Sequence, residues 1–425
     1  MKKITYKDLQ LKIEQELFAE IEQCFNGYSK LYESIGESYW EDKYFYELIK
    51  HALDIKDHYA VDAVLKRVVE NLNLENVSLK LFVYQDNRFN VNCFPRKTDN
   101  GTTQLQIFVS QHFFNNLNED EQVGIIGHEV AHFLFNHFKY PVHGLVNYSF
   151  KIGDIGELKS NLIYHSKVSE ITSDIIGLVA NDFNYKAYST ALVKSTTGLN
   201  DSANSVFSIT PLIDIVLKQF DDYANDMFFH NSQSTHPLMP IRVKIINTIA
   251  KSNLLKHYGE VVSDKDYEIY KKEYDNLINE IIKTLYPELY PDNAEINKVL
   301  IPLAVAVMLA DKIIDEKETS LIKSMIKRSN LDFPELDAML NPTLEIDFQE
   351  VHDHLVKDAI KKSKQNSFKK GLIIPVIRKL ILVAASDGKI ETTELMTIYK
   401  YAKEFGITKK EIILLIKTQY KVWWC

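Results

Sequence analysis

The chain has 425 residues, 45% of them hydrophobic and 25% charged, and this composition predicts a folded protein of two or three domains. Its formal net charge of −8 argues against broad binding to nucleic acids or anionic membranes. Because it has three cysteines without a disulfide framework, no visible signal peptide and no apolar run long enough for a transmembrane span, we expect a cytoplasmic protein.

Residues 1–60 form the first predicted segment, which is helical and rich in aromatic side chains. We expect these side chains to pack in a core; a groove that recognises a ligand through aromatic rings is the alternative. The aromatic residues concerned are Tyr28, Tyr32, Tyr39, Trp40, Tyr44, Phe45 and Tyr46.

Two short strands are predicted next. Leu79–Tyr84 and Gln104–Ser110 alternate apolar and polar residues, and the stretch between them is rich in turn residues, including Pro95 and Asp99-Asn100-Gly101. If one of these strands is an exposed edge, an extended peptide can pair with it through backbone hydrogen bonds. A small packed hairpin is the alternative.

A helix is predicted over residues 118–138. Asn118 can cap its start, and Glu121 lies at the capping-box position. Apolar residues recur at helical spacing at Val123, Ile126, Val130, Phe133 and Leu134.

This helix contains the most informative motif of the chain, Gly-His-Glu-Val-Ala-His over residues 127–132. Residues i and i+4 share a helix face, so His128 and His132 can hold one tetrahedral zinc ion while Glu129 reaches its water. A buried helix whose histidines only form hydrogen bonds is the alternative.

A zinc site of this kind needs a third protein ligand. Zincins that take it from the same segment need Gly and His three and six residues after the second ligand, but Phe135 and Phe138 occupy those places. The third ligand must therefore come from another part of the chain.

A second helix, predicted over residues 167–180, offers that ligand. Its apolar residues are Val168, Ile171, Ile175, Leu178 and Val179. Glu170 and Asp174 are spaced i, i+4, so one carboxylate can bind metal while the other accepts a hydrogen bond from a ligating histidine. Glu170 is the leading third ligand, and the other candidates are Asp154, Glu157 and His165.

Several motifs follow one another in an order typical of a known family. They are Asn92-Cys93-Phe94, Asp120-Glu121-Gln122, His128–His132 with His137, Glu170 with Asp174, and His236-Pro237 with Arg242. Residues 60–250 therefore resemble the zinc peptidases related to the CAAX prenyl protease and the heat-shock protease HtpX, a gluzincin family. The chain departs from the family pattern at Cys93, at Thr172-Ser173 and in lacking the membrane spans of the best-known relatives.

The resemblance implies zinc ligation by His128, His132 and Glu170. It also implies that Glu129 is the general base for peptide hydrolysis, and that Asp174 supports the site. A protein or peptide substrate follows from this activity.

The resemblance adds two further groups. His236 and Arg242 resemble an active-site pair that donates hydrogen bonds to the tetrahedral intermediate or to the substrate backbone. A loop end at His236 and an exposed cation at Arg242 are the alternatives. Asn92, Cys93 and Phe94 are the residues expected to contact the substrate beside an edge strand.

The C-terminal third contains a repeat. An apolar helix ends in Asp311-Lys312-Ile313-Ile314-Asp315 with Glu318 following, and another ends in Asp387-Gly388-Lys389-Ile390-Glu391 with Glu394 following. Residues 295–418 resemble a TerB-like domain, the all-helical module named for tellurite resistance. We expect it to sense a signal or to dock a regulatory protein partner.

The two acidic turns could share a Mg²⁺ or Ca²⁺ ion. Its oxygen ligands would come from Asp311, Glu318, Asp387 and Glu394. Ordinary turn and helix-capping chemistry is the alternative, since a Glu near the start of the next helix is a common cap.

The predicted fold is α+β and predominantly helical, with a zincin-like metalloprotease domain that holds a small β-sheet. The predicted parts are an N-terminal helical segment (1–60), the peptidase domain (61–255), a helical connector (256–294) and an all-α TerB-like domain (295–425). The predicted function is a zinc metalloendopeptidase. A latent or non-catalytic zincin scaffold in a stress-response binding protein is the alternative.

Overall fold

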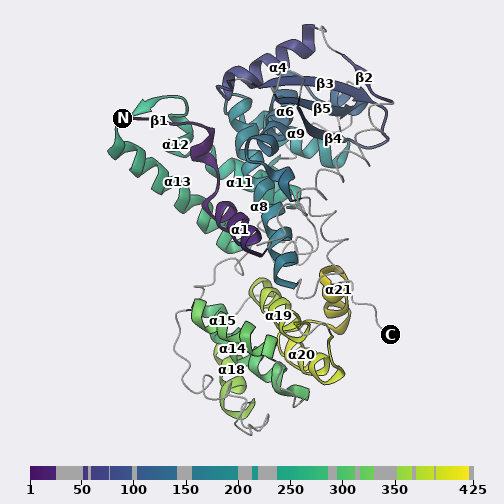
Figure 1. The fold of residues 1–425 in the computed structure, drawn as a ribbon, viewed down its shortest axis with the longest axis vertical. Helices are drawn as coiled ribbons and strands as arrows, with labels where there is room; N and C mark the ends of the chain where they lie inside the picture. Colours follow the sequence, from purple (N-terminus) through teal and green to yellow (C-terminus); the bar gives the residue numbers. More distant parts are fainter. Residues whose placement is uncertain are drawn as a thin grey trace. The chain divides into compact units, whose positions relative to one another are not determined.

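We describe the fold from a computed structural model of the chain, shown in Figure 1. The structure describes residues 1–24, 51–55, 59–75, 77–97, 103–140, 156–199, 213–218, 237–285, 294–311, 316–329, 352–365, 370–386 and 389–420. The aromatic residues expected to pack between positions 28 and 46 lie outside these ranges.

The chain divides into two compact units, which are described separately. One unit holds Met1–Tyr148, Asn161–Tyr223 and Ser234–Ile281. The other holds Ser149–Ser160, Ala224–Gln233 and Ile282–Cys425. Within the described residues, no helix is both long enough and apolar enough to cross a membrane.

The first unit contains a four-stranded mixed sheet in the order β2-β3-β5-β4. Its strands are β2 (Leu53–Asp54), β3 (Ser78–Tyr84), β4 (Val91–Lys97) and β5 (Thr103–Ser110). Both predicted strands are thus present, as β3 and β5, but they pair in parallel and so do not form a hairpin with each other.

Strand β4 was not predicted from alternation. It pairs antiparallel with β5 and is a terminal strand of the described sheet. Proline lacks a backbone N–H and is tolerated in edge strands, so Pro95 fits this position. Of the two predicted strands neither is at the end of the described sheet; its terminal strands are β2 and β4, and β4 carries Asn92, Cys93 and Phe94.

The first unit also contains helices, of which α5 (Gln111–Asn116) and α6 contact the sheet. Among them, α6 contacts β4 and β5 and also packs against α4 and α9. The helices of eight or more residues are α1 (Lys12–Cys24), α4 (Tyr59–Asn71), α6 (Glu119–Leu134), α8 (Gly156–Ala180), α9 (Tyr185–Thr197), α11 (Met239–Ile249) and α13 (Asp264–Leu285).

Helix α6 begins as its sequence predicts. The side chain of Asn118 accepts a hydrogen bond from the backbone N–H of Glu121, and the Glu121 carboxylate accepts one from the N–H of Asn118. Glu121 is also buried against the ammonium of Lys194 on α9, at 2.8 Å. The helix ends at Leu134, earlier than predicted, and Asn136 then adopts a left-handed conformation with φ of 57°.

Small residues let α6 and α8 approach closely. A Cβ atom at Gly177 would lie 2.7 Å from the carbonyl oxygen of Gly124, and one at Gly127 would collide with the side chain of Ala180. Because real Cβ atoms do not approach other atoms this closely, glycine permits the contact between the two helices. That contact places the polar faces of α6 and α8 against each other.

The second unit is helical throughout its described elements. Helices α14 and α19 pack against each other in its core, and each is followed by a second helix, α15 or α20. The elements are α14 (Ala294–Met308), η6 (Leu309–Asp311), α15 (Glu316–Ser329), the π-helical turn His352–Val356, α18 (Lys357–Gln365), α19 (Lys370–Ala384), α20 (Thr392–Glu404) and α21 (Lys409–Tyr420).

Candidate metal centre and active-site cleft

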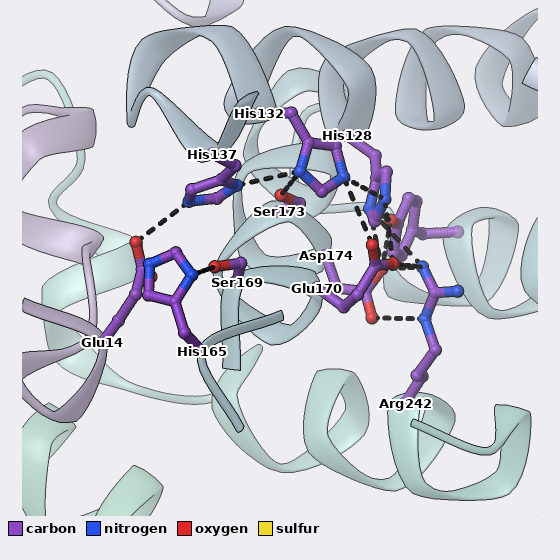
Figure 2. Close-up of polar contacts among 11 residues, drawn as sticks. Glu14, His128, His132, His137, His165, Ser169, Glu170, Ser173, Asp174 and Arg242 are labelled. Atoms are coloured by element: carbon purple, nitrogen blue, oxygen red, sulfur yellow. Dashed lines mark hydrogen bonds and ion pairs between the residues drawn. The ribbon is translucent and has the colours of Figure 1, made fainter. Parts of the chain in front are cut away.

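Three side chains from α6 and α8 converge on one point (Figure 2). The Nε2 atoms of His128 and His132 are 3.2 Å apart, and the carboxylate oxygens of Glu170 lie 3.4 Å from the first and 3.5 Å from the second. A tetrahedral zinc ion with bonds of about 2.1 Å requires ligand atoms roughly 3.4 Å apart. The three donors therefore fit a zinc ion, with a fourth position left for water.

This is the only such group of His, Cys, Asp or Glu side chains among the residues that the structure describes. Of the other candidate ligands, Asp154 and the side chain of Glu157 lie outside the described residues. His165 is buried near Ser169 and does not join the group. Glu170 is thus the carboxylate that the structure places beside the two histidines.

Asp174 supports His128 from behind. The Nδ1 atom of His128 is 3.0 Å from Oδ1 of Asp174, so the ring can donate its second N–H to the carboxylate and present Nε2 to a metal. Tyr188 on α9 also donates its hydroxyl to Oδ1, at 2.8 Å. These contacts fix the orientation of the His128 ring.

Arg242 on α11 completes this group. Its guanidinium donates two hydrogen bonds to Asp174, from Nε to Oδ2 at 2.7 Å and from Nη2 to Oδ1 at 2.5 Å. Burial by itself would raise the pKa of Asp174. The lowering by Arg242 and His128 is larger, so the pKa lies below its ordinary value. The buried carboxylate is therefore held as an anion. Arg242, for which an exposed cation is the alternative, is partly buried beside Asp174, with 18% of its side chain exposed, and lines the cleft.

The carboxylates of Asp174 and Glu170 change the pKa of His128. Burial lowers the pKa of His128, but Asp174 and Glu170 raise it more, to about 9. In the absence of metal the imidazole is thus protonated at neutral pH. A cation placed between the ligands would replace that proton.

Glu129 follows His128 on α6 and lines the same cleft. Burial is the main reason that its pKa is raised, to about 7. A carboxylate whose pKa lies near neutrality is well matched to accept and return a proton at neutral pH.

The cleft beside these residues has a volume of about 440 Å³ and is bounded on one side by β4. Asn92, Cys93 and Phe94 all line it, as do Glu129 and Arg242. Phe94 packs edge-on against Phe108 of β5. Burial raises the pKa of the Cys93 thiol well above its ordinary value, so this side chain is a neutral thiol.

Two histidines of the family-like motifs, His236 and His137, are not among the three proposed metal ligands. His236 lies outside the described residues. His137, which was noted only as part of the motif, is in contact with the site: its Nδ1 atom is 2.9 Å from Nδ1 of His132.

Sequence reasoning missed Glu14 and Tyr188 altogether. Each carries a polar group into the buried region around the ligands, from α1 and α9 respectively. Neither belongs to a motif or to a spacing that marks a ligand, so no signal in the sequence could have identified them.

One comparison with known proteins gives a match to part of the chain. Residues 56–250 match the model of peptidase family M48. Neither the curated proteins nor the solved structures yield a match. The matched range includes α6, α8 and α11 and excludes α1 and the whole of the second unit's core.

Proposed function

With residues 56–250 identified as a metallopeptidase domain of family M48, we propose that this domain is a zinc endopeptidase with His128, His132 and Glu170 as metal ligands and Glu129 as general base. The observation that carries the proposal is the convergence of the three ligand atoms, all within 4.8 Å of one another, at a cleft that Glu129 also lines. A helix with unrelated histidines would not place a carboxylate of a second helix at ligand distance.

Each residue has a part in peptide hydrolysis. Zinc, when bound, supplies a water of lowered pKa and polarises the carbonyl of the scissile bond. Glu129 takes a proton from the attacking water and passes it to the leaving amine. Asp174 orients His128 by accepting a hydrogen bond from its Nδ1.

Strand β4 is proposed to hold the substrate. As a terminal strand of the described sheet it can pair with an extended peptide, whose backbone would then run along the cleft past Glu129. Asn92, Cys93 and Phe94 would contact the substrate there. Main-chain pairing of this kind gives affinity with little dependence on the peptide sequence.

Arg242 and His236 are proposed to act on the reacting carbonyl as well. The guanidinium of Arg242 lines the cleft and lies 3.8 Å from Glu170, and we expect it to place positive charge beside the developing oxyanion. In addition, its pairing with Asp174 makes it part of the support for His128.

For the second unit we propose a TerB-like fold and a role in sensing or docking a regulatory partner. Its repeated helix pairs, α14 with α15 and α19 with α20, support this reading. The Glu394 carboxylate accepts a hydrogen bond from the N–H of Glu391 at 2.6 Å, as a capping residue does, and Asp387 lies outside the described residues. A Mg²⁺ or Ca²⁺ ion held with Asp311 and Glu318 therefore stays a prediction from the sequence, as do the cytoplasmic location and the link to a stress response.

The test is digestion of a diverse peptide library by the zinc-loaded protein beside a Glu129→Gln variant. Loss of the base should lower kcat/KM by at least about a hundredfold while zinc content stays at one ion per chain. Cleavage by the unmodified protein alone supports the endopeptidase. No cleavage with zinc bound would favour the latent scaffold, and cleavage by both proteins would reject the role of Glu129.

A further inference from the structure

A carboxylate from outside the peptidase match reaches the metal centre. Glu14 lies on α1, whereas the family match begins at residue 56. Its side chain is 1% exposed and points toward His137 in Figure 2. Burying a carboxylate costs free energy unless the carboxylate is paired, so the partners of Glu14 indicate its role.

The first partner is His137, whose Nε2 atom lies 2.9 Å from Oε1 of Glu14. The other ring nitrogen of His137 lies 2.9 Å from Nδ1 of His132. A continuous path of hydrogen bonds therefore joins Glu14 to a proposed zinc ligand.

The direction of each hydrogen bond follows from Glu14. A carboxylate only accepts, so Nε2 of His137 must donate to it. With that single proton on the His137 ring, Nδ1 of His137 accepts, and His132 donates to it from its own Nδ1. That tautomer leaves the Nε2 lone pair of His132 free to bind the metal, in the direction of His128 and Glu170.

The second partner of Glu14 is Thr172 on α8, whose hydroxyl donates to Oε2. Burial by itself would raise the pKa of Glu14. The combined lowering by His137, His165 and Thr172 is larger, so the pKa lies below its ordinary value. Thr172 and Ser173 are two of the positions at which the sequence departs from the family pattern. The hydroxyl of Ser173 lies 3.5 Å from Nδ1 of His132. These two neighbouring departures, unlike Cys93, thus lie along the same path.

We propose that Glu14 is a positioning residue for the zinc ligand His132 and acts through His137. The inference rests on the proposed zinc site. The two histidine ligands would then be oriented alike: His128 directly by Asp174, and His132 by Glu14 with one histidine in between. The N-terminal helix α1 is accordingly a component of the metal centre.

The test measures the zinc dissociation constant of the full chain by competition with a chelator at fixed pH. Removing a carboxylate in direct contact with a ligating histidine weakens metal binding by about 10- to 100-fold. Because Glu14 acts through His137, we expect Glu14→Ala to weaken zinc binding by about 10-fold, the lower end of that range. Glu14→Gln keeps an oxygen acceptor and should recover part of the affinity. Visible spectra of the Co²⁺-loaded proteins should show the altered geometry at His132 in the alanine variant.

The matched control is Glu121→Gln. Glu121 is also a buried carboxylate with a buried partner, Lys194, and it also forms hydrogen bonds with Asn118 at the start of α6. It should lower the melting temperature of the metal-free protein and leave both the zinc affinity and the Co²⁺ spectrum unchanged. A purely structural role for Glu14 would make the two variants behave alike.

A second comparison tests the path itself. In a His137→Phe background, Glu14→Ala should cause little further loss of affinity, because the two residues act in series. An unchanged dissociation constant in Glu14→Ala, or an equal loss in both backgrounds, would overturn the proposal. If the unmodified chain binds no zinc, both the proposed function and the proposal about Glu14 fail. If the chain binds zinc with an affinity that does not depend on Glu14, only the proposal about Glu14 fails.

Discussion

His128 and Asp174 lie 46 residues apart in the chain and are joined by a 3.0 Å hydrogen bond between buried side chains. The contact exists because α6 and α8 approach closely at glycine residues. It leaves Nε2 of His128 directed at the metal position.

Asp174→Asn should destabilise the fold and weaken zinc binding. It removes the charge of a buried carboxylate that pairs with the partly buried guanidinium of Arg242, and breaking a buried ion pair costs about 3–5 kcal/mol. The zinc dissociation constant should rise by about 10- to 100-fold. Urea unfolding and chelator competition measure the two effects.

The control for this variant is Arg67→Gln, which removes a cation that pairs with Glu119 and Asp120 at the surface. Surface ion pairs contribute about 1 kcal/mol or less, so its unfolding curve should be nearly unchanged. Equal losses of unfolding free energy in both variants would show that the Asp174–Arg242 pair stabilises the fold no more than a surface ion pair does.

Gly127→Ala should lower stability by about 1–3 kcal/mol, because the added methyl group overlaps the side chain of Ala180 and forces α6 away from α8. The zinc affinity should fall as well, since the shift separates His128 from Asp174. Gly198→Ala offers a comparison: there the added atom meets nothing, and only the positive φ of 72° is strained. We expect zinc affinity to fall in Gly127→Ala and not in Gly198→Ala. An unchanged zinc affinity in Gly127→Ala would contradict the role of the close contact between α6 and α8.

Glu121→Gln should destabilise the chain by about 3 kcal/mol, since it removes the carboxylate that holds the ammonium of Lys194 at 2.8 Å in a buried position. It also weakens the cap at the start of α6. Denaturant unfolding of the metal-free protein measures the change. A loss below about 0.5 kcal/mol would show that the pair does not stabilise the fold.

Zinc binding should become tighter as the pH rises. The pKa of His128 is raised to about 9 in the metal-free protein, so below that pH the imidazole carries a proton that zinc must displace. The apparent dissociation constant should therefore fall by about tenfold per pH unit above neutrality and level off near pH 9. Isothermal titration in buffers of different ionisation enthalpy counts the released protons, and release of none at pH 7 would contradict the prediction.

Local sequence patterns determined much of this site. The i, i+4 spacing of His128 and His132 puts both rings on one face of any helix, and Asn118 marks where that helix begins, so neither depends on distant contacts. Glu170 could be chosen as the third ligand because a site with two histidines needs one more donor and the next helix offers a carboxylate. The strands β3 and β5 followed from alternation, and the mostly helical α+β fold with a small sheet is as expected.

Tertiary structure alone decided the remainder. Strand β4 has weak alternation and a proline, and only its pairing with β5 reveals it as the edge that lines the cleft. Arg242 is turned toward Asp174, 68 residues away, and Glu14 reaches His137 across 123 residues. Periodicity reports which face of an element is apolar, but not which other element packs against it. The polar contacts around the two histidines arise from that packing, so the sequence indicated the proposed ligands and the fold determined their hydrogen-bond partners.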